Sequence, residues 1–142
     1  MLASMKSHAS LFAGMCALFC GSLLTSCASL GSGSANAKPG QVEHVVLVWL
    51  KEAGSEAKRG ELIDTAKGFQ SQIPGIVSVS AGTAVPSSRP VVDDSFDIGL
   101  VMRFENKAAL DAYEKHPVHV KAVKEVLAPA AKKLLVYDVM VR

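Results

Sequence analysis

The chain has 142 residues, 49% of them hydrophobic and 20% charged, which allows one ordinary domain with its own hydrophobic core. Its formal net charge is +2 at pH 7, and basic residues are interleaved with acidic ones, as at Lys51 and Glu52 and within residues 121–125. This pattern is typical of a solvated surface and lacks the basic stripe of nucleic-acid-binding proteins, so we expect no nucleic-acid partner.

The first 26 residues have the composition of a secretory signal. Their only formal charge is Lys6, and an apolar run from Leu11 to Leu24 follows that is too short and too interrupted by glycines for a membrane span. The run ends in Leu24-Thr25-Ser26-Cys27, an order that resembles the lipobox of bacterial lipoproteins. The resemblance implies cleavage before Cys27 and diacylglycerol on its sulfur, which would anchor the mature protein to a membrane.

Processing at this site also determines the expected cysteine content and net charge of the mature chain. Cys16 and Cys20 leave with the signal, so the mature chain keeps only Cys27 and forms no internal disulfide. Loss of Lys6 lowers the Lys and Arg count from 15 to 14 against 13 Asp and Glu, a formal charge of +1.

Ala28 stands where enteric-type lipoproteins retained in the inner membrane typically have aspartate. We therefore expect a lipid-anchored protein of the cell envelope, in the outer membrane facing the periplasm if the host is Gram-negative.

Residues 27–41 are expected to link the lipidated cysteine to a folded domain. They are mostly alanine, serine, glycine and asparagine, a composition that buries too little apolar surface to fold. A flexible segment of this length spans ~20 Å, enough to hold a small domain clear of a lipid surface. The remaining residues, 42–142, are predicted to form a single domain.

Apolar periodicity and turn residues divide this domain into seven elements. We predict strands at residues 42–51, 76–83, 96–104 and 134–141, and helices at residues 55–73, 106–116 and 118–127. Pro74-Gly75 ends the first helix, and Pro117 separates the last two. Residues 84–95 are predicted to be a long surface loop. The third strand is expected to place five apolar side chains on one face: Phe96, Ile98, Leu100, Met102 and Phe104.

The order β-α-β-β-α-α-β predicts an α+β fold, a ferredoxin-like plait with a four-stranded, mostly antiparallel sheet and helices on one face. The first and last strands are apolar on both faces, so the face without helices would be an association surface. We therefore expect a homodimer in which two sheets pack face to face as an α/β barrel. Two sets of first-strand residues are candidates for the interface: Val45, Leu47 and Trp49, or Val46, Val48 and Leu50.

Three histidines remain after cleavage: His44 in the first strand, and His116 and His119 on either side of Pro117. These residues lie in three motifs, His44-Val45-Val46-Leu47-Val48, then Phe104-Glu105 with Leu110-Asp111-Ala112-Tyr113 and His116-Pro117-Val118-His119, and last Val136-Tyr137-Asp138. In these motifs, residues 42–141 resemble the stress-responsive α/β-barrel (Dabb) family. The resemblance implies a dimeric ferredoxin-like barrel. A plant polyketide cyclase of that family uses the tyrosine and the second histidine of the signature, which are Tyr113 and His119 here.

The residues themselves leave the roles of these side chains open. His119 is expected in the first turn of a helix, where the dipole keeps an imidazole neutral and able to act as a general base. Tyr113 is expected to hydrogen-bond either that imidazole or a substrate carbonyl. Tyr113 and His119 are therefore either a catalytic, ligand-facing pair or a structural hydrogen bond. For His116 we favour a cap at a helix end, and for His44 a satisfied core histidine; both are weaker candidates for ligand binding.

Together these features predict a stress-related, lipid-anchored dimer that binds a small hydrophobic or aromatic ligand. The first alternative is an enzyme, polyketide-cyclase-like or a lyase, in which His119 and Tyr113 transfer protons. The second is a non-catalytic dimeric interaction module. We expect no cofactor, because the sequence has no glycine-rich phosphate loop. A metal site is disfavoured, because a proline break separates His116 from His119 and no further ligand lies beside them at a zinc-like spacing.

Overall fold

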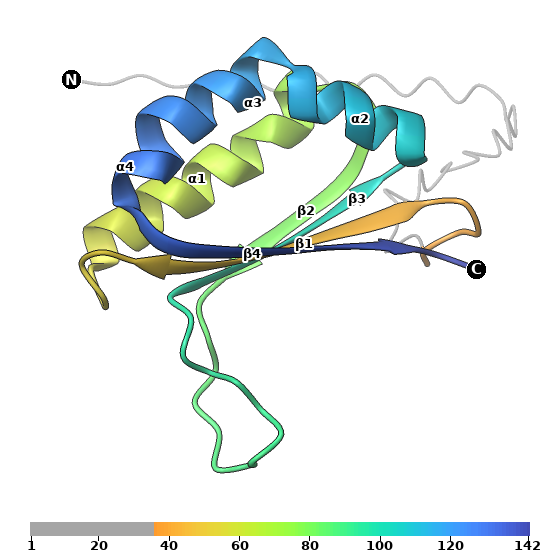
Figure 1. The fold of residues 1–142 in the computed structure, drawn as a ribbon. Coiled ribbons are helices and arrows are strands. Elements are labelled where there is room, and N and C mark those ends of the chain that lie inside the picture. Colours follow the sequence, from red (N-terminus) through yellow and green to blue (C-terminus); the bar gives the residue numbers. More distant parts are fainter. Residues whose placement is uncertain (1–35) are drawn as a thin grey trace, which may run out of the picture. The chain divides into compact units, whose positions relative to one another are not determined.

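Four antiparallel strands form one sheet in the computed structural model, which describes residues 36–142 (Figure 1). They are β1 (Val42–Leu50), β2 (Ile76–Gly82), β3 (Ile98–Phe104) and β4 (Ala131–Met140). Their order across the sheet is β2-β3-β1-β4, and each neighbouring pair is antiparallel. The predicted ferredoxin-like α+β fold is confirmed. The expected signal sequence, Cys27 and most of the linker lie outside the described residues.

The helices cover one face of this sheet (Figure 1). They are α1 (Glu56–Gln72), α2 (Lys107–Lys115), α3 (Pro117–Ala122), the π-helical turn η1 (Val123–Leu127) and α4 (Ala128–Ala130). The last predicted helix, 118–127, begins one residue earlier and is continued by α4 to Ala130, with a π turn in its middle, and β4 begins three residues earlier than predicted. No helix within residues 36–142 is long and apolar enough to cross a membrane.

Helix α1 packs on the sheet as its periodicity predicts, with Leu62, Ala66 and Phe69 buried. The turn that follows it brings the chain very close to α2. Gly75 has φ +84°, and a Cβ at this position would lie 2.7 Å from the Cβ of Ala109. Glycine is therefore required there both for its backbone conformation and for space.

Side-chain caps mark the beginnings of both α2 and α3. Asn106 is the N-cap of α2, and its side-chain oxygen accepts from the Ala109 N–H at 2.9 Å. His116 ends α2 and is also the N-cap of α3, where its Nδ1 accepts from the Val118 N–H at 3.3 Å. Pro117 follows as the first residue of α3. Proline suits this position because the first helical residue has no N–H partner to lose.

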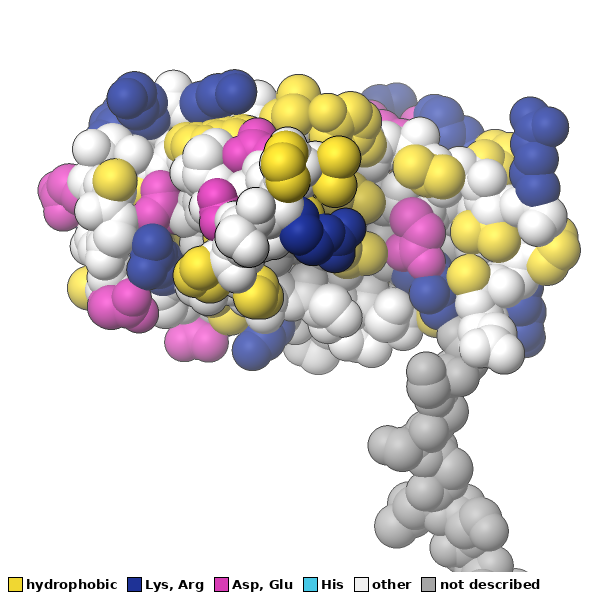
Figure 2. Space-filling view, turned by 90° about the horizontal axis from the view of Figure 1, so that it is seen from below, with side chains coloured by type: hydrophobic (Ala, Val, Ile, Leu, Met, Phe, Trp, Pro, Cys, Tyr) yellow, Lys and Arg dark blue, Asp and Glu magenta, His cyan; other side chains and the backbone are white. Residues whose placement is uncertain are grey.

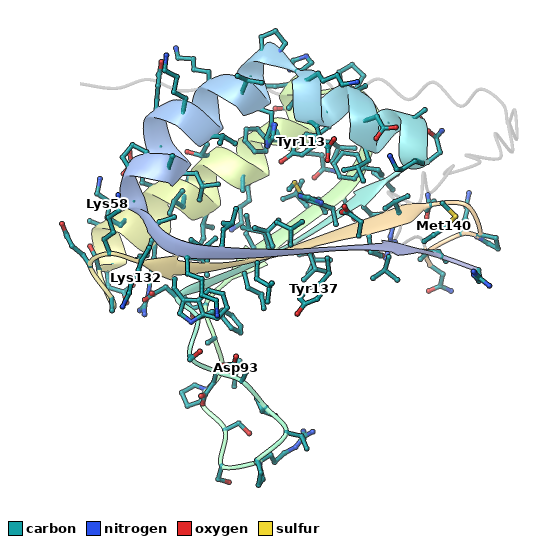
Figure 3. The ribbon with its side chains drawn as sticks, viewed as in Figure 1. Lys58, Asp93, Tyr113, Lys132, Tyr137 and Met140 are labelled. Carbon is teal, nitrogen blue, oxygen red and sulfur yellow. The ribbon has the colours of Figure 1, made fainter. Side chains whose placement is uncertain are left out.

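Strand β1 alternates strictly between the two faces of the sheet. Its buried residues, including His44 and Val46, face the helices, so Val45, Leu47 and Trp49 lie on the opposite side. We call this opposite side the free sheet face; its apolar members are Val45, Leu47, Trp49, Val101, Leu135, Tyr137 and Val139. Tyr137 points away from the helices, whereas Tyr113 lies between the helices and the sheet (Figure 3).

The free sheet face is open in the described part of the chain. Its β4 residues Tyr137 and Val139 are both more than half exposed. Residues 83–97 extend away from the sheet on this same side (Figure 1). Seen from that direction, apolar side chains lie among basic and acidic ones (Figure 2). The sequence left two candidate interface sets open, and only the set with Val45, Leu47 and Trp49 is on the face without helices.

The prediction for Phe96 was wrong. Strand β3 begins only at Ile98, and Phe96 packs against Trp49 on the free sheet face, with ring centroids 6.4 Å apart. The cause is Asp97, whose buried carboxylate accepts from the backbone N–H of Leu50 and of Gly54 and from the Arg59 guanidinium, at 2.8 to 2.9 Å. We call these three hydrogen bonds the Asp97 cluster. They direct the Asp97 side chain toward the helices, so the neighbouring Phe96 side chain lies on the free sheet face.

Candidate functional site

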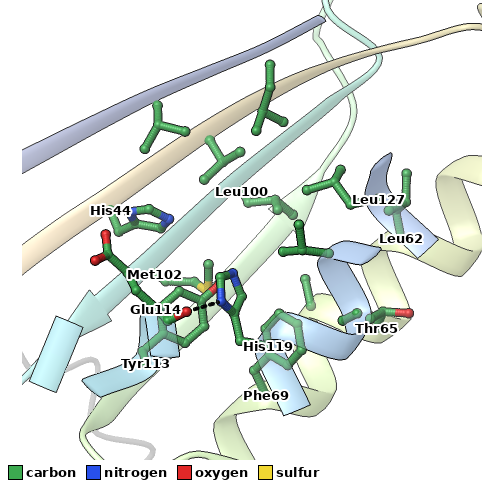
Figure 4. A pocket seen from close by; sticks show the side chains of 16 residues that line it. His44, Leu62, Thr65, Phe69, Leu100, Met102, Tyr113, Glu114, His119 and Leu127 are labelled. Atoms are coloured by element: carbon green, nitrogen blue, oxygen red, sulfur yellow. Dashed lines mark hydrogen bonds between the residues drawn. The ribbon is translucent and has the colours of Figure 1, made fainter. Parts of the chain in front are cut away.

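A cavity of about 440 Å³ lies between the sheet and the helices (Figure 4). Its wall comes from β1, β3 and β4 on one side and from the helical elements on the other. Most of the sixteen wall residues are apolar: Val46, Leu62, Ala66, Phe69, Leu100, Met102, Ala122, Val123, Leu127, Leu134 and Val136, with His44, Thr65, Tyr113, Glu114 and His119. Leu134 and Val136 are on the helix side of the edge strand β4, which explains why they are partly exposed.

Three of the four predicted site residues meet at one end of this cavity. The ring centroid of Tyr113 is 5.9 Å from that of His44 and 4.1 Å from that of His119. His44 comes from the sheet, Tyr113 from α2 and His119 from α3, so residues distant in sequence converge (Figure 4). Phe69 of α1 packs edge-on against both Tyr113 and His119 and fixes their orientation.

His119 is held as a neutral imidazole. Its Nδ1 is 3.2 Å from the backbone carbonyl oxygen of Glu114, an acceptor, so Nδ1 carries the proton and donates. Burial lowers the pKa of His119 below its ordinary value of 6.5, against the opposing effect of this hydrogen bond. The Nε2 lone pair is therefore free to accept. The neutral state agrees with the prediction, although burial rather than the helix dipole is its main cause.

Tyr113 is almost completely buried, with 2% of its surface exposed, yet it lines the cavity. Among residues 36–142 its hydroxyl has no hydrogen-bond partner. Burial, reinforced by the Glu114 charge, raises the pKa of this phenol well above its ordinary value. Tyr113 therefore keeps its proton at neutral pH and presents an unused hydrogen-bond donor. The alternative of a structural hydrogen bond between Tyr113 and His119 is not what the structure contains; the two rings stack instead.

His44 is paired with Asp138, which the sequence motif contains but did not indicate as its partner. Its Nδ1 lies 2.6 Å from Oδ1 of Asp138, which is directly opposite it in the β1–β4 register. Because a carboxylate only accepts, the His44 Nδ1 donates this bond. His44 is thus satisfied at one nitrogen, as expected for a core histidine, and also forms part of the cavity wall. Finding Asp138 from sequence would have required the pairing register of the first and last strands.

His116 does not line the cavity. Its side chain caps α3 instead, at the N-terminus of that helix rather than on the last carbonyls of α2. Glu114 was also not predicted; it is exposed, and it lies in the cavity wall. In the described part of the chain, no group of three His, Cys, Asp or Glu side chains is arranged to hold a metal ion.

Comparison with known proteins gives one family match. Residues 42–141 match the family model of the Stress responsive A/B Barrel Domain, Dabb. No curated protein sequence matches the chain. A solved Dabb-family protein with a ferredoxin-like fold from Mesorhizobium loti is 27% identical, with a TM-score of 0.60, covering 72% of this chain and 98% of its own.

Two further solved structures differ in what is known of them. A dimeric ferredoxin-like protein of unknown function from Jannaschia sp. is 26% identical, with a TM-score of 0.59 and coverage of 72% of this chain and 100% of its own. A hydroxynitrile lyase from Passiflora edulis is 21% identical, with a TM-score of 0.65 and coverage of 74% and 96%. At that identity the lyase supports the shared fold and nothing about the reaction.

Proposed function

Because the chain belongs to the stress-responsive A/B barrel domain (Dabb) family, we propose that it is an envelope lipoprotein whose domain binds a small hydrophobic or aromatic ligand. The observation that carries this proposal is the cavity of about 440 Å³, apolar along most of its wall and polar at one end. Small-molecule sites typically have this size and this composition, with a few polar groups that orient the ligand.

A neutral fluorescent probe tests ligand binding directly. N-phenyl-1-naphthylamine should bind the purified full chain, and Ala66→Phe, which fills the cavity from α1, should abolish the fluorescence gain. Ala122→Phe should do the same from the opposite wall. Ala57→Phe is the matched control, because Ala57 is an exposed residue of the same helix. Equal binding by all four proteins would refute the cavity as the ligand site.

A second function, acid/base catalysis, is favoured by the states of His119 and Tyr113. In a polyketide-cyclase-like or lyase step, His119 Nε2 would remove a proton from the carbon beside a substrate carbonyl. The electrons of that C–H bond would form an enolate, and the Tyr113 hydroxyl would donate a hydrogen bond to its oxygen. Both groups have the protonation state that these roles require.

Deuterium exchange separates catalysis from simple binding. With 4-phenyl-2-butanone in D₂O, an enzyme of this type should accelerate exchange of the protons beside the carbonyl. His119→Ala should then lower the exchange rate by ~10² to 10⁴, and Tyr113→Phe should lower it less. Exchange no faster than in buffer, with the ketone bound, leaves ligand binding as the function. A scaffold that acts only as an interaction module should neither bind the ketone nor accelerate exchange.

We also propose that two copies pair through the free sheet face. Its apolar side chains are too many for an ordinary solvated sheet surface, and related ferredoxin-like proteins are dimers. Leu47→Asp should turn the dimer into a monomer in sedimentation experiments. Lys67→Asp, on the exposed side of α1, should leave it intact. A wild-type monomer at micromolar concentration would contradict the pairing.

Membrane attachment through Cys27 is proposed from the sequence. Stable anchoring takes more than one acyl chain, each buried CH₂ adding ~0.8 kcal/mol, so a diacylated or triacylated Cys27 should hold the protein to membranes. Cys27→Ala should release the protein or leave it unprocessed in cell fractionation. Wild-type protein recovered wholly in the soluble fraction, with unmodified Cys27, would refute it. The outer membrane is the proposed destination in a Gram-negative host.

A further inference from the structure

The polar end of the cavity contains hydrogen-bonding groups but no lysine or arginine. None of the sixteen wall residues is Lys or Arg, and the one formal charge in the wall is the Glu114 carboxylate. A second carboxylate, Asp138, lies behind His44. The neighbouring cation, Lys107, is bound to Asp111 on α2. No lysine or arginine in the wall offers a counter-charge beside these carboxylates, so burying an anion at this end is costly.

The unused hydrogen-bonding groups of Tyr113 and His119 at this end are complementary in kind. The Tyr113 hydroxyl keeps its proton and is a donor without a partner. His119 uses Nδ1 to donate to the Glu114 carbonyl, so its Nε2 is an acceptor. Because the two ring centroids are only 4.1 Å apart, both groups serve the same part of the cavity. A ligand group that satisfies them must both accept and donate.

The opposite end of the cavity offers no second polar anchor. Its wall there includes Leu62 and Leu127, with Thr65 as the hydroxyl-bearing residue (Figure 4). The Thr65 hydroxyl already donates to the Glu61 carbonyl at 2.7 Å within α1. This end is therefore suited to the apolar body of a ligand whose single polar group lies at the Tyr113 end.

We infer that the ligand of this cavity, given the ligand binding proposed above, carries an uncharged hydroxyl, as a phenol or an alcohol, on an apolar body. A hydroxyl accepts from Tyr113 and donates to His119. A carboxylate only accepts, so it leaves His119 Nε2 unpaired and lies in the field of Glu114. An ammonium group only donates, so it leaves the Tyr113 proton without an acceptor.

A matched series of compounds tests this on the purified full chain by calorimetry. The series is butylbenzene, 4-butylphenol, 4-butylbenzoate and 4-butylbenzylamine, which share one apolar body. The phenol should bind about tenfold more tightly than butylbenzene, and the benzoate and the amine should bind more weakly than the phenol. Tyr113→Phe should lower phenol affinity by severalfold and leave butylbenzene affinity unchanged.

The substitution Glu114→Gln tests how the negative charge of Glu114 affects ligand affinity. This substitution keeps the backbone carbonyl that His119 uses, so it should raise benzoate affinity while the phenol is little affected. Glu125→Gln, an exposed residue outside this cavity, is the control. If no compound binds, the ligand-binding proposal fails together with this inference. If butylbenzene binds as well as the phenol, or the benzoate binds best, the cavity binds ligands but the hydroxyl assignment is overturned.

Discussion

Two buried polar clusters lie toward opposite ends of β1, and they use their hydrogen-bonding capacity differently. In the Asp97 cluster, three donors converge on one carboxylate, from two backbone amides and Arg59. At the cavity, Tyr113 and His119 are partly or fully buried but each keeps an unused group. A buried polar group normally has its partners, so a vacant one facing a cavity can be completed by water or by a ligand. The first cluster therefore stabilises the fold, and the second is available for binding.

The largest expected effect on stability is at the Asp97 cluster. Asp97→Ala removes the acceptor for two backbone amides and leaves the Arg59 charge without its buried partner. We expect the free energy of unfolding to fall by ~3 kcal/mol, the lower end for a broken buried pair, because Arg59 keeps some contact with water. Urea unfolding measures this loss. Asp93→Ala, in the exposed loop, should change stability far less, and an equal loss in both variants would contradict the assignment.

Removing Arg59, the other partner of the ion pair, should lower the free energy of unfolding less than removing Asp97. Arg59→Met takes away one of the three donors but leaves the amides of Leu50 and Gly54 on the Asp97 carboxylate. Its unfolding midpoint should therefore lie between those of the wild type and Asp97→Ala. A variant as unstable as Asp97→Ala would mean that the ion pair, and not the backbone amides, provides most of the stabilisation.

The sequence predicts the strands and helices better than it predicts the partners within the two polar clusters. Period-two and helical patterns depend on side-chain type alone, so they predict the strands, α1 and the Asn106 cap closely. Phe96 fits the strand pattern equally well, but its face is decided by three donors that converge on its neighbour Asp97 from distant segments. The cavity is similar: Tyr113 and His119 are recognisable in the sequence, whereas the partner of His44 depends on the strand register and Glu114 on the relative placement of two helices.

The two clusters should also respond to acid in different pH ranges. Burial alone would raise the pKa of Asp97, but its hydrogen bonds with Leu50, Gly54 and Arg59 lower it below the ordinary 3.8. Its stabilisation is therefore complete above about pH 4 and is lost as the pH falls through the lowered pKa. Urea unfolding between pH 2 and 7 should show this loss in the wild type and a reduced loss in Asp97→Asn. Identical pH profiles would contradict it.

For His119 the same reasoning gives a higher range. Its pKa is lowered by burial, so the unfolded chain binds the proton more tightly than the folded one. The stability that depends on its neutral form is complete above about pH 6.5 and falls as the pH drops below it. His119→Gln should flatten the change in unfolding free energy between pH 7 and 5. A slope as steep as that of the wild type would mean that other groups cause it.

The smallest effect on stability is expected at the cavity. Tyr113→Phe removes a hydroxyl that has no partner among the described residues, so no donor or acceptor is left stranded. The free energy of unfolding should change by less than about 1 kcal/mol. Thermal unfolding checks this, with Asn106→Ala as a control whose lost cap should cost ~1 kcal/mol. A large loss in Tyr113→Phe would mean that the hydroxyl has a structural role.

The π turn at η1 has a consequence for how the cavity wall would tolerate a change in chain length. Its defining bond runs from the Ala128 N–H to the Val123 carbonyl, five residues back, so the turn holds one residue more than an α-helix would. Val123 and Leu127, at its two ends, both line the cavity. Deleting one residue here would restore ordinary helical spacing, and the residues after the turn would keep their faces because the π turn already absorbs the extra residue. The wall between Val123 and Leu127 would then be one residue shorter, while no residue of the polar end is altered.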